Sequence, residues 1–250
     1  MMNFIIKFKN NKYIYSILGV AIFLFLWQFF SSFYKPIILP SPLYTFETLF
    51  SMIFQKDTWY NIWLSFLRLF AGYFLSMILG TFLGFFMGLN EKINMFFNPM
   101  IVMLQTTPNI SWILIAIIWF GLNSKIVVFT ILISILPIFV INTREGVKST
   151  DEELLQMSYV YKFSDFRRFT HIYLPSVKPY IASASIITIE RGWKIGAMAE
   201  LLSLDTGIGA GLYWARNNLQ TEKIFAWTII LVSLGYISSM ILKKIIKKFI

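Results

Sequence analysis

Long apolar runs separated by short polar connections dominate this chain, and six of them reach the length of a membrane-spanning helix. A hydrocarbon core of about 30 Å needs about 20 predominantly apolar residues in one helix. The expected spans are residues 13–33, 62–89, 99–120, 125–142, 179–199 and 225–242. The third is the least regular, because Pro108 and Asn109 interrupt it and can divide it into a short helix and a longer one. The pattern predicts an all-α, polytopic membrane protein.

A charged segment at about 143–178 separates the fourth and fifth apolar runs. Lipid offers no hydrogen-bond partners to polar groups, so this segment must face water or a partner protein. Ser149 and Thr150 each precede a glutamate by three residues, Glu152 and Glu153, which is the capping-box signature at the start of a helix. We therefore expect a helix to begin here.

Apolar residues recur with helical spacing after this cap. They are Leu154, Leu155, Tyr159 and Phe163. Pro175 and Pro179 follow, and because a proline removes a backbone donor and clashes with the preceding turn, we expect them to prevent simple continuation of a helix. An amphipathic helix on the wet face of a membrane protein is suited to binding a partner, although a solvated linker has the same pattern.

Composition agrees with the apolar pattern. Hydrophobic residues make up 57% of the chain, aromatic residues 18% and charged residues only 14%, which differs from an ordinary soluble domain. The net charge of +10 does not indicate nucleic-acid binding, because the basic residues lie at the ends of apolar runs and form no aromatic-rich patch. With no cysteine, a disulfide framework and thiolate metal sites are excluded.

The distribution of basic residues predicts an orientation. With the N-terminus inside, the inner connections hold most of the 22 Lys and Arg residues, so both termini and the 143–178 segment are expected in the cytoplasm. Lys7, Lys9 and Lys12 precede the first apolar run, which is longer than a signal-peptide core and lacks a small-residue cleavage site. We interpret this run as a retained first span.

Three glycines repeat every four residues on one face of the second span: Gly80, Gly84 and Gly88. This pattern lets helix backbones approach closely. It can mark an interface between subunits, but we favour packing within one chain. No internal repeat is apparent along the sequence, and we expect residues 1–250 to form a single transmembrane domain.

The fifth span carries charge. Glu190 lies about 16 Å along a helix from Pro179, near the middle of a bilayer, where a bare charge costs at least about 2.5–3.5 kcal/mol. Glu190 and Lys194 are spaced to pair on one helix face, and Arg68 in the second span is a further partner for Glu190 or Glu200. Such groups should face the protein interior or water.

Motifs along the chain resemble one family in the same order. These are Leu39-Pro-Ser-Pro-Leu43, Ser65-x-x-Arg68-x-x-x-Gly72, the glycine repeat, Trp119-Phe-Gly121, Asn142-Thr143, Ala199-Glu200, Gly207-Ile-Gly209 and, in the charged segment, Ile172-x-Leu174-Pro175. Each motif alone is weak, but the ordered set resembles permeases of ATP-binding-cassette importers. The similarity is to the nitrate, sulfonate, taurine and bicarbonate branch, which includes thiamine-precursor permeases. This implies the type I importer permease fold with about six transmembrane helices.

The first half of the charged segment departs from that family. Its coupling loop begins Glu-Ala-Ala and has a glycine six residues after the glutamate, whereas this chain has Gln156, Met157, Ser158 and Lys162. A glycine suits such a turn because it adopts positive φ freely, so here the turn either stays helical or moves towards Phe163. The residues that the resemblance implies for ATPase docking are Ser149, Thr150, Glu152, Glu153, Leu155, Gln156, Tyr159, Lys162 and Phe163.

The resemblance also implies the partners. They are a second copy of the permease, two cytoplasmic ATPase subunits and an external substrate-binding protein that contacts the loops near Pro40 and Gly207. No phosphate-binding loop occurs in this chain, so any ATP is bound by another polypeptide. We expect no cofactor, no metal and no catalysis, only passage of a small polar or anionic solute through a bacterial inner membrane.

Alternatives remain for the charges of the fifth span. Arg68, Glu190, Lys194 and Glu200 can line the translocation path, or they can form an ion-pair network that holds the second and fifth spans together. Two other classes of protein use such charges: an ion-coupled secondary transporter, usually built from internal repeats, and a membrane-embedded enzyme that uses Glu190, Lys194 and Glu200.

Overall fold

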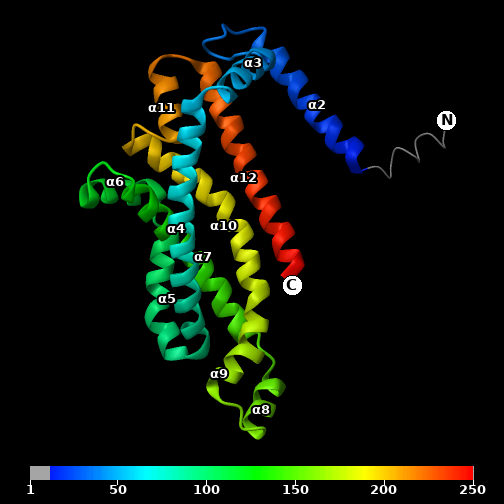
Figure 1. Ribbon diagram of the computed structural model, residues 1–250, viewed down its shortest axis with the longest axis vertical. Helices are drawn as coiled ribbons and strands as arrows, with labels where there is room; N and C mark the ends of the chain where they lie inside the picture. Colours follow the sequence, from blue (N-terminus) through cyan, green and yellow to red (C-terminus); the bar gives the residue numbers. More distant parts are fainter. Residues whose placement is uncertain (1–11, 250) are drawn as a thin grey trace, which may run out of the picture.

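The structure, a computed structural model, describes residues 12–249, and every regular element in this part of the chain is helical (Figure 1). Lys7 and Lys9 of the first connection lie outside the described residues. The helices are α2 (Lys12–Ser31), α3 (Pro42–Ile53), α4 (Lys56–Leu89), α5 (Glu91–Thr106), α6 (Asn109–Phe120), α7 (Lys125–Lys148), α8 (Glu152–Val160), α9 (Asp165–Arg168), the π-helical turn η1 (Phe169–Tyr173), α10 (Leu174–Ser203), α11 (Ile208–Asn217) and α12 (Thr221–Phe249).

Helices α4 and α7 form the most extensive contact in the molecule. The glycine repeat of α4 faces α7: a Cβ atom added at Gly80 would lie 2.7 Å from the Cβ of Phe139, and one at Gly84 would overlap the backbone of Val140. Ser76 adds a hydrogen bond from its hydroxyl to the Leu132 carbonyl across the same contact, at 3.0 Å. Packing of the repeat within one chain is therefore confirmed.

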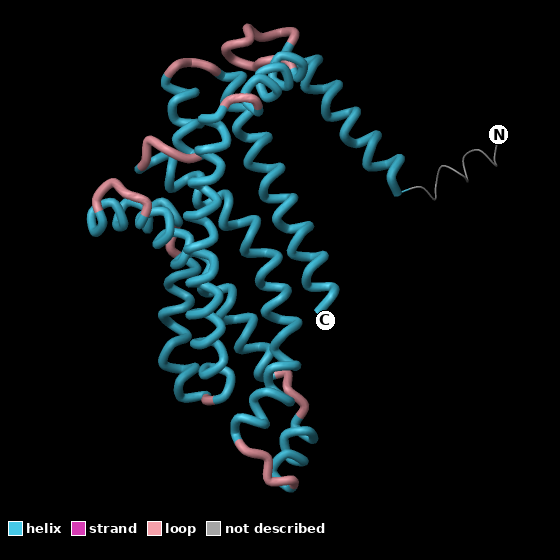
Figure 2. Tube along the Cα trace, in the orientation of Figure 1, coloured by secondary structure: helices cyan, strands magenta, loops and turns pink. Residues whose placement is uncertain are grey.

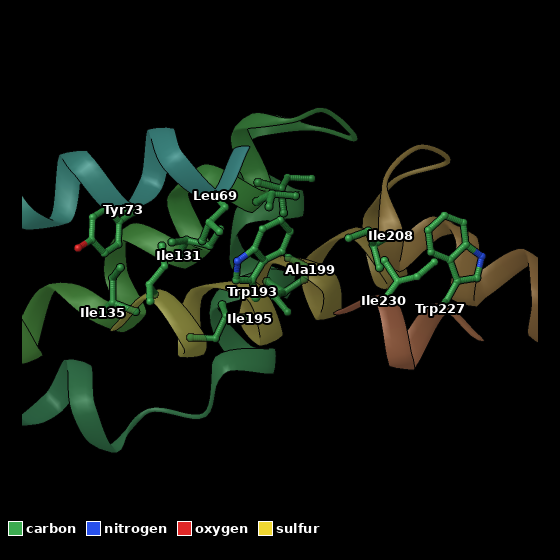
Figure 3. Close-up of a cluster of buried hydrophobic side chains, with 14 of the residues drawn as sticks. Leu69, Tyr73, Ile131, Ile135, Trp193, Ile195, Ala199, Ile208, Trp227 and Ile230 are labelled. Atoms are coloured by element: carbon green, nitrogen blue, oxygen red, sulfur yellow. The ribbon is translucent and has the colours of Figure 1, made fainter. Parts of the chain in front are cut away.

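The hydrophobic core lies where α4, α7 and α10 meet (Figure 3). Ile131 and Ile135 of α7 are completely buried there, and Leu69 of α4 packs beside Trp193 of α10. The cluster extends to Ile208 and Trp227 of α11 and α12. The core thus fixes α10 between the α4–α7 pair and the C-terminal helix.

Among residues 12–249, four helices are long and apolar enough to cross a membrane: α2, α4, α7 and α12. The expected third span is broken, because α5 and α6 meet at an angle of 98° beside Pro108. Pro108 divides it as anticipated, but α5 begins at Glu91, so the first piece is the longer one. The expected fifth span is a continuous helix of 30 residues, α10, whose charges keep it outside this apolar set.

The connection between α7 and α10 differs from the expectation in two ways. Helix α7 continues to Lys148, so residues 143–148 of the charged segment belong to a packed helix. Pro175 and Pro179 do not stop the chain from remaining helical. The N–H of Leu174 donates to the carbonyl of Phe169, five residues back, and this wider π turn takes up the disruption just before Pro175.

Helix α2 diverges from the bundle, as the tube view shows (Figure 2). Only 6% of its residues from Ile14 to Ser31 are buried. It is held at its C-terminal end, where the indole of Trp27 donates to the carbonyl of Pro40 at 3.0 Å and stacks on Phe225 at 5.4 Å between ring centroids. Between α2 and α4 lies the short helix α3, and α4 begins at Lys56, six residues before the start of the expected second span.

Candidate functional site

A buried ion pair joins α4 to α10. Nη1 of Arg68 donates to Oε1 of Glu200 at 2.8 Å, and both side chains are shielded from solvent, with 7% and 0% of their surface exposed. The Ser65 hydroxyl donates to the same carboxylate at 2.7 Å. Sequence reasoning offered Arg68 as a partner for Glu190 or Glu200, and the structure pairs it with Glu200.

This pair also organises the start of α11. Arg68 donates to the carbonyl and the hydroxyl of Thr206 at 2.8 and 2.9 Å, and the backbone N–H of Gly209 donates to Glu200 at 3.1 Å. The N–H of Ile208 donates to the Ser65 hydroxyl at 2.9 Å. Glu200 and Ser65 therefore satisfy N–H groups that a helix N-terminus leaves free, and the carboxylate lies at its positive end.

We call the residues of this network the Arg68 hub: Asn61, Ser65, Arg68, Ser124, Glu200 and Thr206. Gly207 explains why the motif beside it needs glycine. Its φ is 110°, and a Cβ there would overlap the carboxylate of Glu200. The glycines of this loop thus serve close packing against Glu200. Asn61, Ser124 and Thr206 were missed because hydrogen bonds between distant segments leave no periodic signal.

Glu190, Arg191 and Lys194 lie elsewhere on α10. All three side chains are exposed, and none takes part in the four ion pairs found among residues 12–249. The expected Glu190–Lys194 pair is therefore absent from this structure. Arg68 and Glu200 hold α4 and α10 together, whereas Glu190 and Lys194 remain outside that network.

These charges belong to one exposed stripe along α10. Ser183, Ile187, Glu190, Lys194 and Met198 follow one another at spacings of three or four residues, and all are exposed. The neighbouring faces of α10 carry buried residues that belong to the hydrophobic core, among them Ile189 and Trp193. A helix with charges on its one open face, in the centre of a membrane bundle, requires water or another protein along that face.

The segment that links α7 to α10 forms a small lobe at the far end of the bundle from α3, containing α8 and α9 (Figure 1). Helix α8 is capped by Asp151, whose carboxylate accepts from the N–H of Glu153 at 2.8 Å. The capping boxes expected from Ser149 and Thr150 do not form. These residues follow the last residue of α7, Lys148, and their backbone N–H groups donate to the carbonyls of Glu145 and Val147 at its C-terminal end. The Ser149 hydroxyl donates to the carbonyl of Gly146, and Thr150 is buried.

Lys162 takes the conformation of the glycine it replaces. Its φ is +52°, in the left-handed region. The N–H of Lys162 donates to the Tyr159 carbonyl at 3.0 Å, and that of Phe163 donates to the Ser158 carbonyl at 2.9 Å, which together make a Schellman end for α8. The turn therefore neither stays helical nor moves to Phe163.

The exposed apolar residues of α8 agree in part with those expected from the sequence, since Leu154 and Tyr159 are exposed whereas Leu155 and Phe163 are not. Leu154, Met157 and Tyr161 are 49%, 52% and 70% exposed and recur at helical spacing. Leu155 and Phe163 are half-buried. Tyr159 is exposed but packs under the guanidinium of Arg168, 4.3 Å from the ring centroid. Leu154, Met157 and Tyr161 lie on one face at spacings of three and four residues, and Val160 beside them is also exposed.

Aromatic side chains attach the lobe to α4. The ring of Phe85 meets those of Phe169 and Tyr173 edge-on, with centroids 5.1 and 5.7 Å apart. Both partners lie in η1, which continues directly into α10. The lobe is therefore connected both to the charged helix and to the α4–α7 pair.

Together the membrane-spanning helices, the charged face of α10 and the projecting lobe define a class: an integral membrane component of a solute transport system. Comparison with known families agrees, since residues 76–250 match the family of binding-protein-dependent transport system inner membrane components. The chain belongs to this family. It is the multi-pass membrane permease of an importer of the ATP-binding-cassette type, and it is not an enzyme, so the embedded-enzyme alternative is wrong.

Several relatives are transport permeases. The chain is 31% identical over 198 residues to the aliphatic sulfonates transport permease protein SsuC of Escherichia coli K12, covering 79% of this chain and 75% of that one. It is 25% identical over 246 residues to the SsuC protein of Bacillus subtilis 168, covering 97% and 88%. The bicarbonate transport system permease protein CmpB of Synechococcus elongatus is 26% identical over 229 residues, covering 87% and 82%.

Proposed function

We propose that this chain is a single-domain subunit of a homodimeric, ATP-driven importer that carries a small polar or anionic solute delivered by an external binding protein. The exposed charged stripe of α10 carries this proposal. Two copies related by two-fold symmetry would bring their stripes to a shared water-filled path, which satisfies Glu190, Arg191 and Lys194 without burying them in lipid.

The balance of charge favours anionic solutes. Lys194 on the stripe and Arg191 beside it outnumber Glu190, so each copy contributes net positive charge to the path. Relatives are named as permeases for aliphatic sulfonates, bicarbonate and nitrate, and another is named for formylaminopyrimidine. The first three solutes are anions. In this proposal Arg68 and Glu200 act at the end of the path, where they fix the positions of α10 and α11.

The lobe is the proposed docking site for the ATPase subunits. Leu154, Met157 and Tyr161 form an apolar stripe that would bury itself in a groove of the ATPase, in the helix-in-groove mode of recognition. The nine residues implied for docking by the family resemblance differ in exposure. Those that are exposed are Ser149, Glu152, Glu153, Gln156, Tyr159 and Lys162. Leu155 and Phe163 are half-buried and support the stripe from inside the lobe, and Thr150 is buried.

The orientation proposed is that of the positive-inside rule, with both termini and the lobe in the cytoplasm. ATP-driven closure of the two ATPases would then move the paired lobes together. Because η1 joins the lobe to α10 without a loop, this movement would reach the charged stripe directly. The two copies would alternate between outward- and inward-open states around the solute.

The test is co-purification from the native membrane under mild conditions. We expect an ATPase subunit with the wild type and its loss from a Leu154→Asp/Met157→Asp variant. Leu122→Asp is the matched control. Leu122 is 72% exposed in the connection between α6 and α7, at the end of α7 opposite the lobe. An ATPase that stays with the double variant would refute the docking stripe. Absence of any ATPase from the wild type would refute the ATP-driven importer.

A further inference from the structure

A lateral groove runs along the bundle between α4, α10 and α12, and we call it the α10–α12 groove. Its volume is about 740 Å³. The lining is almost entirely apolar and includes Phe70, Met77, Ile181, Ala182, Ile189 and Leu242. Of its polar members, Ser238 already accepts a hydrogen bond from the indole of Trp193 at 3.1 Å. Neither the charged stripe nor the lobe accounts for this groove.

The groove is as long as one leaflet of a membrane. Its α10 wall extends from Lys178 to Ile189, which is about 16 Å at the rise of a helix. A hydrocarbon core of about 30 Å gives each leaflet about 15 Å. The groove can therefore hold an extended acyl chain from the headgroup level to the bilayer centre.

Charge is found at one end only. Lys178 is the single charged residue in the lining, and its side chain is exposed and takes part in none of the ion pairs among residues 12–249. Ile241 and Ile245 of α12 line the same end, and helical spacing puts Lys248 on their face one turn further on. An apolar channel with cations at a single mouth matches the polarity of an anionic phospholipid, with its phosphate at the lysines.

We infer that the α10–α12 groove binds one anionic glycerophospholipid, with an acyl chain against Ile181 and Leu242 and the phosphate between Lys178 and Lys248. A peptide helix in the same place would leave both lysines without a counter-charge, whereas a phosphate supplies it. With the orientation proposed above, the lipid comes from the cytoplasmic leaflet, which is the anionic one. Reversal of that orientation would change the leaflet but not the binding.

The experiment measures lipid retention by native mass spectrometry on the purified full-length chain, offered equal amounts of phosphatidylglycerol and phosphatidylcholine. We expect the wild type to retain phosphatidylglycerol preferentially. Lys178→Ala should lower that retention about fivefold, as expected for one lysine at an anionic lipid surface, and the Lys178→Ala/Lys248→Ala pair should lower it further. Lys92→Ala is the control, because Lys92 is exposed at the start of α5, outside the groove.

A second variant tests the apolar part. Ala182→Phe would fill the groove and should remove both lipids, while leaving the lysines in place. Equal retention of the two lipids by the wild type, or equal loss in Lys92→Ala and Lys178→Ala, would overturn the inference. Wild type without bound lipid, together with a weaker dimer in Ala182→Phe, would mean that a second copy of the chain fills the groove. None of these outcomes depends on an ATPase or a solute.

Discussion

Neutralising Glu200 tests whether the Arg68 hub holds α10 in place. In Glu200→Gln the shape is nearly unchanged, but the guanidinium of Arg68 loses its counter-charge while 93% shielded, and the new amide presents N–H groups towards the N–H of Gly209 or the hydroxyl of Ser65. Breaking one side of a buried ion pair costs about 3–5 kcal/mol. We take about 3 kcal/mol, because one oxygen of the side chain still accepts.

For a chain of this size that loss lowers the midpoint of thermal unfolding by about 6–12 °C. The assay is the apparent unfolding midpoint in detergent, with Glu190→Gln as the control. Glu190 has the same chemistry on the same helix but is exposed and has no ion-pair partner, so its substitution should change stability by less than about 0.5 kcal/mol.

Combining Glu200→Gln with Arg68→Met completes the test. Each single change leaves one buried group unpaired, whereas the double change removes the charge from both. The double variant should therefore be no less stable than either single variant, and the coupling should reach about 3 kcal/mol. Additive losses, or an equal loss in Glu190→Gln, would refute the view that the hub acts as one paired unit.

Three further outcomes are expected. Lys162→Gly should strengthen α8 by about 0.5–1 kcal/mol, since glycine adopts the left-handed turn without strain, and hydrogen exchange of α8 should slow; faster exchange would contradict this. Gly80→Ala should cost about 1–3 kcal/mol by thermal unfolding, because α7 occupies the space. Gly19→Ala, with no atom within 4 Å, should cause no loss and should gain up to about 1 kcal/mol, because alanine favours the helix over glycine. In the assembled importer Lys194→Glu should lower uptake of an anionic solute about tenfold, measured with labelled solute, while the exposed loop variant Lys35→Glu should not.

Local pattern predicted the elements better than it predicted their partners. The apolar runs located the long helices, and the glycine repeat of α4 identified a close backbone contact before its partner α7 was known. Arg68 and Glu200 were flagged because charge within an apolar run demands explanation. Their pairing was one of two options, since 132 residues separate them and only the folded bundle decides which carboxylate lies nearby.

The misplaced details have local causes. The sequence offered Ser149 and Thr150 as caps for α8, but Asp151 is the cap in the structure. The position of the cap depends on where α7 ends, at Lys148, which the local pattern does not specify. Pro175 was expected to end a helix, but a π turn before it absorbed the disruption. Leu155 and Phe163 were assigned to a partner-facing surface, and the structure leaves both half-buried within the lobe.

The π turn at Phe169–Tyr173 also fixes the angular phase between the two ends of one long rod. From Asp165 to Ser203 the chain is continuously helical. The rotation of Phe166 about the helix axis is therefore fixed relative to that of Glu190 and the charged stripe. Removing one residue from the turn would convert it to an ordinary α-helical turn and rotate one end against the other by about 100°. The number of residues in the π turn therefore determines which way the side chains of α10 face relative to those of α9.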